Sequence, residues 1–265
     1  MAVERVDTPD DPRLAPYRDL RLRETGQRDG LFVAETRDVV RRLLAGRRFV
    51  VHSVLLTDAA RAPLADALAE RPEVPVYLAT PAVLKAVVGF DFHRGCVALG
   101  VRGTEPSVDD VLAGTPRRLV LLEDVSNPDN VGGVLRAARA LGAGGTLLSP
   151  ACGDPLYRKA IRVSVGAALL LPWARVTDWD AALARVRAAG FTLIALHPHD
   201  GVDVASLAVP ARAALLLGAE GAGLRAATRT AADVTVRIPM AVGVDSLNVA
   251  TACAIALERM GGARR

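Results

Sequence analysis

The sequence predicts an α/β protein of two domains, and three observations support this prediction. Short apolar runs alternate along the 265 residues with stretches whose apolar residues recur every third or fourth position. Several apolar runs, such as LVLL at 119–122 and ALLLG at 214–218, lack the alternation of a half-exposed strand and are typical of buried strands in a parallel sheet. Residues 102–117 collect Gly, Pro and Ser around one short amphipathic piece, as linkers do. We therefore predict domains over 1–104 and 117–265, joined by a linker over 105–116.

The first domain is predicted to alternate strands with helices. Its clearest helix places Val39, Val40, Leu43 and Leu44 on one buried face and ends near Gly46. Its other predicted helices cover 58–70 and 81–88, and its predicted strands cover 31–35, 49–57, 74–79 and 96–101.

The second domain is predicted to repeat this rhythm. The predicted strands cover 118–124, 145–148, 169–173, 191–196, 213–218 and 234–238. The predicted helices cover 130–141, 179–189, 223–231 and 246–260. Trp173 and Trp179 are expected to pack within this domain rather than to serve as stacking platforms.

Composition excludes several classes of protein. With 51% hydrophobic and 23% charged residues the chain can form a full core, which excludes a disordered protein. We expect no membrane span, because no apolar run approaches about 18–20 residues. The first residues, MAVERVDTPDDPRL, include early acids and lack the apolar stretch of a secretory signal. Three widely spaced cysteines (Cys96, Cys152 and Cys253) fit neither a disulfide framework nor a metal cluster, so we expect a cytoplasmic protein without a metal.

The basic residues allow two interpretations. The formal net charge of +4 permits an acidic partner without requiring one. Only Lys85 and Lys159 are lysine, and all the other basic residues are arginine, the residue that binds phosphates bidentately. The alternative is a GC-rich genome, which favours arginine codons everywhere. One group of arginines gathers in the first domain, as an RNA-backbone footprint or as a solvated face: Arg21, Arg23, Arg28, Arg41, Arg42, Arg47 and Arg48.

Three segments of the second domain break the apolar pattern, each at the end of a predicted strand, where ligands bind in open α/β sheets. The first is EDVSNPDNVGG at 123–133, followed by VLRAARALGA. We expect Asn130 to cap the following helix, from which Arg136 and Arg139 project. A capped turn with solvated arginines explains this segment equally well.

The second segment is LGAEGAGL at 217–224, directly after a buried strand. Its three glycines allow the backbone to approach a ligand closely, and N–H groups at a helix start suit an anion or a carbonyl. A dinucleotide-binding loop is disfavoured, because the order is G-x-x-G-x-G and no acid lies about twenty residues further on.

The third segment is IPMAVGVDSLNVA at 238–250. We expect Ser246 to cap a long helix and the Asn248 amide, in its first turn, to face whatever fills the loop, although Ser-x-Asn alone is usually only a cap. His197-Pro198-His199-Asp200 lacks a third ligand pattern for a metal, so we interpret it as an ordinary loop.

Together the motifs N-P-x-N-x-G-x-x-x-R, G-x-E-x-x-G-L and I-P-M-x-x-G-x-x-S-L-N-V, in this order, resemble the SpoU (TrmH-type) RNA methyltransferases of the SPOUT superfamily. The resemblance covers about residues 117–262. It extends more loosely to FVAE at 32–35 and HRGCVA at 93–98, which look like the family's RNA-binding domain.

The resemblance implies a fold, a cofactor and partners. The second domain would be a SPOUT α/β sheet whose C-terminal segment forms a deep trefoil knot, preceded by a small α/β RNA-binding domain like a ribosomal protein. Knots are nearly absent from proteins, so no pattern predicts one. The enzyme would transfer a methyl group from S-adenosyl-L-methionine to a ribose 2′-hydroxyl of rRNA or tRNA. It would act as a homodimer through the C-terminal domain.

The resemblance also implies site residues. Those matching the cofactor site are Leu217, Gly218, Glu220, Gly221, Ile238, Pro239, Met240, Ser246, Leu247 and Asn248. Those matching the catalytic set are Asn130, Arg136, Glu220, Ser246 and Asn248. The sequence departs from the family at Ala250, where serine is common, and at Thr36, where glycine is usual.

Elementary chemistry limits what these residues do. A ribose hydroxyl must lose its proton as it attacks the methyl group, so the enzyme supplies alignment and help with that proton. The family scheme makes the residue at Arg136 the base, whereas a guanidinium, with a pKa above about 12, is better suited to hold a phosphate or to stabilise the alkoxide. Two other functions stay open: an RNA-binding relative without catalysis, disfavoured because the catalytic set is intact, and a nucleotide-dependent oxidoreductase, disfavoured by the glycine order.

Overall fold

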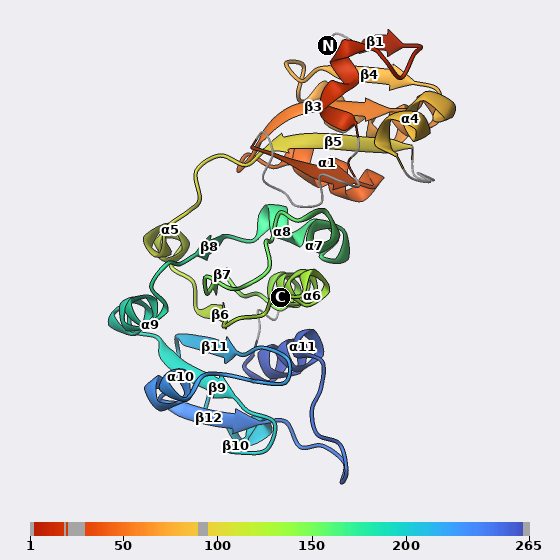
Figure 1. Ribbon diagram of the computed structural model, residues 1–265. Helices are drawn as coiled ribbons and strands as arrows, with labels where there is room; N and C mark the ends of the chain where they lie inside the picture. The colour runs from red at the N-terminus through yellow and green to blue at the C-terminus, as the bar shows by residue number, and fades with distance from the viewer. Residues whose placement is uncertain (1–2, 19, 21–29, 90–94, 262–265) are drawn as a thin grey trace. The chain divides into compact units, whose positions relative to one another are not determined.

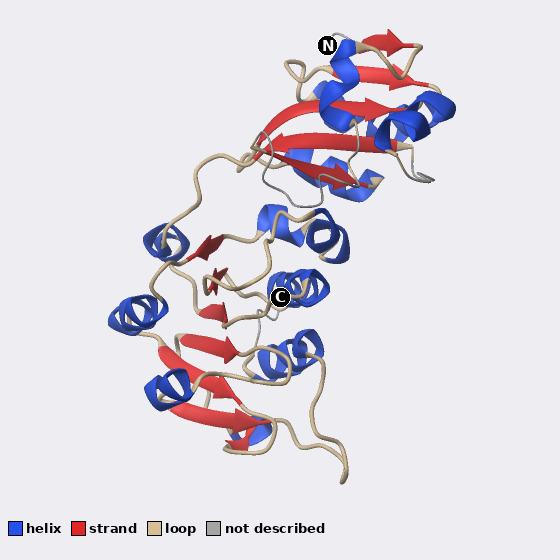
Figure 2. Cartoon of the chain, viewed as in Figure 1, coloured by secondary structure: helices blue, strands red, loops and turns tan. Residues whose placement is uncertain are grey.

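The computed structural model describes residues 3–18, 20, 30–89 and 95–261, which form α/β structure throughout (Figures 1 and 2). The chain divides into two compact units. Unit 1 comprises Met1–Thr104 together with Leu156–Leu170, and unit 2 comprises Glu105–Pro155 and Leu171–Arg265. The predicted organisation differs in two respects. Residues 105–116 belong to unit 2, where they contain helix α5 (Val108–Ala113), and Leu156–Leu170 cluster with unit 1.

Unit 1 contains a five-stranded sheet in the order β1-β4-β3-β5-β2. The β1, β4 and β3 strands pair in parallel, whereas β5 runs antiparallel to both β3 and β2. The strands are β1 (Val3–Val6), β2 (Leu31–Glu35), β3 (Val50–Leu56), β4 (Val76–Ala79) and β5 (Cys96–Val101). The predicted strands at 31–35 and 96–101 are confirmed to the residue, and β1 had no prediction.

The helices of unit 1 follow local capping signals. Thr80 accepts a hydrogen bond from the Val83 N–H and starts α4 (Pro81–Val88), which confirms the predicted bounds. The predicted helix over 58–70 is broken, because Pro63 has no N–H for a helical ladder and a 3₁₀ turn forms around it. The helices are η1 (Pro12–Tyr17), α1 (Arg37–Ala45), α2 (Asp58–Arg61), η3 (Ala62–Leu64), α3 (Ala65–Ala69), α7 (Arg158–Val163) and α8 (Ala167–Leu170).

Segment 156–170 is held in unit 1 by a buried carboxylate. Glu35, at the end of β2, is 5% exposed and pairs with Arg158 at 3.3 Å and with Arg162 at 3.4 Å. The next residue, Thr36, has a φ of 83°, in the region that favours glycine, and caps α1 through its hydroxyl. The departure from the family pattern therefore falls at a position where glycine would relieve backbone strain.

Unit 2 contains a seven-stranded sheet in the order β10-β12-β9-β11-β6-β7-β8, and every strand pair in it is parallel. The central strands β6 and β11 are buried along most of their length, as their uninterrupted apolar runs predict. The strands are β6 (Arg118–Leu122), β7 (Gly145–Leu148), β8 (Trp173–Arg175), β9 (Thr192–Leu196), β10 (Val202–Asp203), β11 (Ala213–Leu217) and β12 (Val234–Arg237).

Helices cover both faces of this sheet (Figure 1). On one face α6 packs against α11, and a Cβ on Gly133 of α6 would lie 2.7 Å from the Ala250 Cβ of α11, so both small residues permit the close approach. On the other face α5 and α9 enclose an apolar cluster that includes Val111 and Trp179. The helices are α6 (Pro128–Ala140), α9 (Trp179–Ala188), α10 (Ala226–Ala231) and α11 (Val249–Arg259), with a 3₁₀ turn η4 (Val204–Ser206).

Two predictions for these elements are wrong. The apolar run predicted as a strand over 169–173 ends helix α8, and β8 begins only at Trp173, because a short apolar run fits either element. The predicted caps are also displaced. Asn127, followed by Pro128, starts α6 in place of Asn130, and Asn248 starts α11 in place of Ser246. Among the described residues no helix combines the length and apolar character that a membrane crossing requires.

Candidate active site

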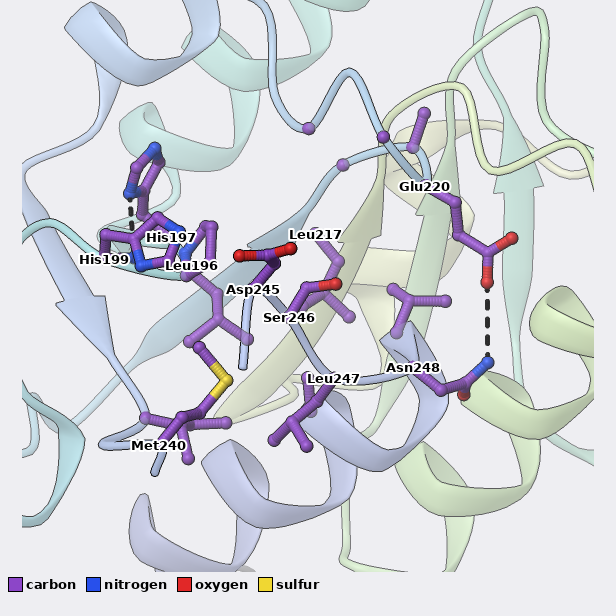
Figure 3. A pocket seen from close by; sticks show the side chains of 18 residues that line it. Leu196, His197, His199, Leu217, Glu220, Met240, Asp245, Ser246, Leu247 and Asn248 are labelled. Atoms are coloured by element: carbon purple, nitrogen blue, oxygen red, sulfur yellow. Dashed lines mark hydrogen bonds between the residues drawn. The ribbon is translucent and has the colours of Figure 1, made fainter. Parts of the chain in front are cut away.

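A pocket of about 640 Å³ opens in unit 2 where β9, β11 and β12 end (Figure 3). Its walls come from residues 196–199 after β9, the loop that starts at Leu217 after β11, and the segment from Ile238 to the start of α11. The carboxyl edge of a parallel sheet is the expected position for a ligand site in this class of fold.

Most residues of the predicted cofactor set meet in this pocket. Nine of the ten line it, and Pro239 is the exception, since Ile238 and Met240 on either side of it form the wall. The nine are Leu217, Gly218, Glu220, Gly221, Ile238, Met240, Ser246, Leu247 and Asn248. The geometry thus brings together residues from two motifs that are about twenty positions apart.

The glycine loop forms one wall and is tightly folded. A Cβ on Gly218 would lie 2.1 Å from the Gly223 carbonyl carbon and 2.3 Å from the Leu224 nitrogen, so only glycine fits there. Ala219 and Gly223 form an isolated antiparallel bridge, and Gly221 and Gly223 have φ angles of 81° and 68°. The loop therefore presents its backbone to the pocket in a shape that depends on glycine.

Asn248 links three polar elements of the site. Its Oδ1 accepts a hydrogen bond from the Ala250 N–H at 2.9 Å and so caps α11. Its Nδ2 donates to Asn130 Oδ1 at 2.8 Å and to Glu220 Oε1 at 3.5 Å (Figure 3 draws the second bond). Three members of the predicted catalytic set, one from each motif, are thereby joined by hydrogen bonds.

Beside this network, the side-chain amide of Asn130 has a hydrogen-bond donor without an acceptor. Its side chain is 4% exposed, and its Nδ2 has no hydrogen-bond partner in the part of the chain that the structure describes. A buried amide N–H without a partner costs free energy, about 1–3 kcal/mol. Such a group in a native fold indicates that a ligand oxygen or a water molecule accepts its hydrogen bond.

Arg136 is not brought into the pocket. It is exposed on α6 and absent from the lining, and no described residue forms an ion pair or hydrogen bond with its guanidinium. The same holds for Arg139, one helical turn further on. The structure thus joins Asn130, Glu220 and Asn248, places Ser246 in the pocket wall and leaves Arg136 on the outside.

Two histidines line the pocket, although the sequence analysis assigned both of them to an ordinary loop. The rings of His197 and His199 lie edge to face, with centroids 6.4 Å apart (Figure 3). His197 Nδ1 accepts hydrogen bonds from the Asp200 N–H at 2.9 Å and the His199 N–H at 3.3 Å. Within the described ranges no group of three His, Cys, Asp or Glu side chains could hold a metal. The sequence signal that could have identified the two histidines as site residues is their position directly after an apolar strand.

A second pocket, of about 420 Å³, lies at the same sheet edge where β6, β7 and β8 end. Its acids are bonded within the chain: Asp124 accepts from Ser149 Oγ at 2.6 Å, and Asp178 caps α9. Its Arg225 pairs with the buried Glu123 at 2.7 Å and with Asp180 at 3.3 Å. The Glu123 carboxylate raises the pKa of Arg225 above its ordinary value, so this arginine stays charged.

The arginine group predicted in the first domain is only partly available. Arg41 pairs with Asp66 at 2.5 Å, Arg42 donates to the Val165 carbonyl, and Arg48 lies over the Phe49 ring. Arg47 is exposed and has no bonding partner among the described residues. Three of the seven lie outside the described residues: Arg21, Arg23 and Arg28.

Comparisons with known proteins give the site a context. The model of the SpoU rRNA Methylase family matches residues 117–258. An uncharacterized tRNA/rRNA methyltransferase of Mycobacterium tuberculosis is 44% identical over 262 residues, which cover 96% of this chain and 90% of that protein. A 23S rRNA (guanosine-2′-O-)-methyltransferase of a Burkholderia species is 34% identical over 178 residues, which cover 66% of this chain and 72% of that protein.

A solved structure agrees with the sequence comparisons. The SpoU methyltransferase AviRb from Streptomyces viridochromogenes, in complex with AdoMet, matches with a TM-score of 0.76 and 26% identity, over 94% of this chain and 97% of that chain. The family match covers more than half of the chain and contains all three motifs of the site. The chain therefore belongs to the SpoU rRNA methylase family.

Proposed function

We propose that this chain transfers a methyl group from S-adenosyl-L-methionine (AdoMet) to a ribose 2′-hydroxyl of rRNA or tRNA. The observation that carries the proposal is the hydrogen-bonded set of Asn130, Glu220 and Asn248 beside the pocket. The Burkholderia relative, a 23S rRNA (guanosine-2′-O-)-methyltransferase, and the complex of AviRb with AdoMet support the same chemistry.

The pocket fits AdoMet by size and by the character of its walls. Its volume of about 640 Å³ lies within the usual range of small-molecule sites. Leu217, Ile238 and Leu247 offer apolar surface for an adenine ring, and the glycine loop offers backbone groups. The unpartnered N–H of Asn130 offers a donor to an oxygen. The same nine lining residues of the predicted set would hold AdoMet; Pro239 would act only by shaping the wall.

The residues of this chain would position the reacting hydroxyl. Bound AdoMet supplies an electrophilic methyl group. Asn248 is fixed at both ends, by the Ala250 N–H and by Asn130, so its amide cannot rotate freely. Asn130 Nδ2 is available to an oxygen of the ribose, and the Glu220 carboxylate can accept a hydrogen bond from a hydroxyl. Ser246 lines the same pocket and would orient the ribose or the donor.

Arg136 would act at the RNA rather than within the pocket of its own chain. Because it is exposed and has no described partner, its guanidinium is free to bind a phosphate or to stabilise a developing alkoxide. We propose that a second copy of the chain covers segment 241–247, which exposes Val242, Val244 and Leu247, and completes the site. The C-terminal unit would thus form a homodimer.

Three further features of the family are proposals for this chain. The segment 238–248 would thread a loop of unit 2 to form the trefoil knot, and it lines the same pocket as the glycine loop. The first domain would bind RNA through exposed arginines such as Arg47. Since the proposed substrates are rRNA or tRNA, we place the protein in the cytoplasm. Neither a metal nor a membrane enters the scheme.

Nucleoside mass spectrometry on total rRNA and tRNA tests this function. A deletion strain should lack one 2′-O-methylated nucleoside that its parent contains. The wild-type gene should restore it, and a gene encoding Arg136→Ala should not. An unchanged set of ribose methylations, together with purified protein that does not bind AdoMet, would contradict the proposal and favour an RNA-binding protein without catalysis.

A further inference from the structure

The charges that line the cofactor pocket are of one sign. Glu220 and Asp245 are its acidic side chains, and none of the described residues that line it is Lys or Arg. His197 Nδ1 is used within its own loop, where it accepts hydrogen bonds from the Asp200 and His199 N–H groups. The pocket thus favours a positively charged ligand.

Asp245 differs from Glu220 in its bonding. Glu220 Oε1 accepts a hydrogen bond from Asn248 Nδ2 at 3.5 Å. Asp245 is exposed, and its carboxylate has no hydrogen bond or ion pair with any described residue. In Figure 3 Asp245 occupies the middle of the pocket, with His197 and His199 to one side and Glu220 to the other. Its charge is therefore directed at the pocket without an internal partner.

We propose that Asp245 is a specificity-determining residue that makes the site prefer the sulfonium donor over its neutral thioether product. This inference rests on the proposed function. AdoMet carries two positive charges, on its sulfonium and its ammonium, and one negative charge on its own carboxylate. S-adenosylhomocysteine (AdoHcy) lacks the sulfonium charge. A carboxylate that lines the pocket attracts the first ligand more strongly, because the attraction between charges falls only as the inverse of distance. Discrimination of this kind would hasten release of the product.

A competing role for Asp245 predicts a different pattern. A carboxylate in a nucleoside pocket often accepts hydrogen bonds from ribose hydroxyls. AdoMet and AdoHcy share the same ribose, so loss of that contact would weaken both ligands equally. The ratio of the two dissociation constants therefore separates charge recognition from ribose recognition.

Isothermal titration calorimetry on wild-type protein and Asp245→Asn tests the inference with three ligands: AdoMet, AdoHcy and sinefungin, which carries an ammonium in place of the sulfonium. We expect the preference for AdoMet over AdoHcy to fall about five- to tenfold in the variant. The variant should bind sinefungin more weakly, as it does AdoMet, whereas its affinity for AdoHcy should change less than twofold.

Two control variants make the result specific. Asp245→Glu keeps the charge and should keep the preference, whereas Asp180→Asn removes an acid from the second pocket and should change nothing. An equal loss of affinity for all three ligands in Asp245→Asn, or an unchanged ratio of the AdoMet and AdoHcy dissociation constants, would overturn the inference while leaving the proposed function intact. Failure of the wild-type protein to bind any of the three would overturn the proposed function, and this inference with it.

Discussion

The two pockets of unit 2 lie on the same edge of one sheet and differ in how their polar groups are bonded. In the pocket at β6, β7 and β8, Asp124, Asp178 and Asp180 are bonded to groups of the chain itself, and Arg225 joins Asp180 to Glu123. In the pocket at β9, β11 and β12, Asp245 has no described partner. Beside this pocket the buried Asn130 amide, which accepts a hydrogen bond from Asn248, retains an unused N–H.

The bonding of polar groups distinguishes a ligand site from a structural pocket. A concave surface with polar residues at the carboxyl edge of a parallel sheet is expected in many α/β proteins. Internally bonded acids stabilise loops and helix starts, whereas groups left without partners need a ligand or water. We therefore propose that the first pocket of unit 2 is functional and the second is structural, and each of four substitutions tests this division.

The largest effect is expected from Gly218→Ala in the functional pocket. The new Cβ would lie 2.1 Å from the Gly223 carbonyl carbon, so the loop must shift away from its present position. We expect AdoMet affinity to fall about 100-fold, close to 2.7 kcal/mol. Calorimetric titration measures this loss. Gly114→Ala is the matched control, since a Cβ there meets nothing within 4 Å; wild-type affinity in Gly218→Ala would show that the loop does not shape the site.

A smaller loss is expected when the unused donor is removed. Asn130→Asp keeps the shape of the side chain and replaces the Nδ2 donor with an acceptor. We expect turnover in a methyl-transfer assay on RNA to fall about 30-fold, because an oriented hydrogen-bond donor near a developing charge is lost.

The control for this change lies on the same helix. Asn127 caps α6, and aspartate caps a helix start as well as asparagine does, so Asn127→Asp should retain activity and melting temperature. Turnover of Asn130→Asp close to that of Asn127→Asp would mean that the unpartnered amide has no role in the reaction.

Glu123→Gln should affect folding rather than binding. Glu123 is 1% exposed and accepts hydrogen bonds from Arg225 N at 2.8 Å, Arg225 Nε at 2.7 Å and Thr228 Oγ1 at 2.5 Å. Replacing the charged acceptor should lower the free energy of unfolding by about 1–2 kcal/mol. Urea denaturation measures this change, and Asp180→Asn, on the exposed side of the same arginine, should change it by less than about 0.5 kcal/mol. A loss of AdoMet affinity without a loss of stability would assign this pocket to the ligand.

The smallest effect is expected from Asp124→Asn in the same pocket. Asp124 has a φ of 57°, which asparagine adopts readily, and the amide oxygen can still accept from Ser149. AdoMet affinity and methyl-transfer rate should stay within about twofold of wild type. Because Asn130→Asp changes a carboxamide only six positions away, contrasting results in the two assays would sharpen the division between the pockets.

The sequence predicted much of the fold because its strong signals are local. The β2 and β5 strands and the α4 helix match their predicted bounds to the residue. The errors arise where contacts between residues far apart in the sequence determine the secondary structure or the unit. The four residues of β1 form a strand because they pair with β4, more than seventy positions away. Ala167–Leu170 is helical although its apolar run fits a strand as well, and segment 156–170 joins unit 1 through Glu35, which no local pattern reveals.

The site was predicted less evenly. The family motifs named ten residues of the glycine loop and of segment 238–248 for the cofactor, and nine of them line one pocket. Their role in binding stays a prediction. The histidines at 197 and 199 and Asp245 were not assigned to the pocket, since they become neighbours only when β9 and β12 pair side by side. The hydrogen bond from Asn248 to Asn130 spans 118 positions and required the structure.

A crystal structure of the chain grown with AdoMet would show which of the two pockets binds the ligand. We expect adenosine density against Leu217, Ile238 and Leu247, with an oxygen or water bonded to Asn130 Nδ2. This assignment also predicts that Asp124 and Arg225 keep their present partners. AdoMet density in the pocket of Asp124 and Arg225, or none in either pocket at a concentration that saturates binding in solution, would contradict it.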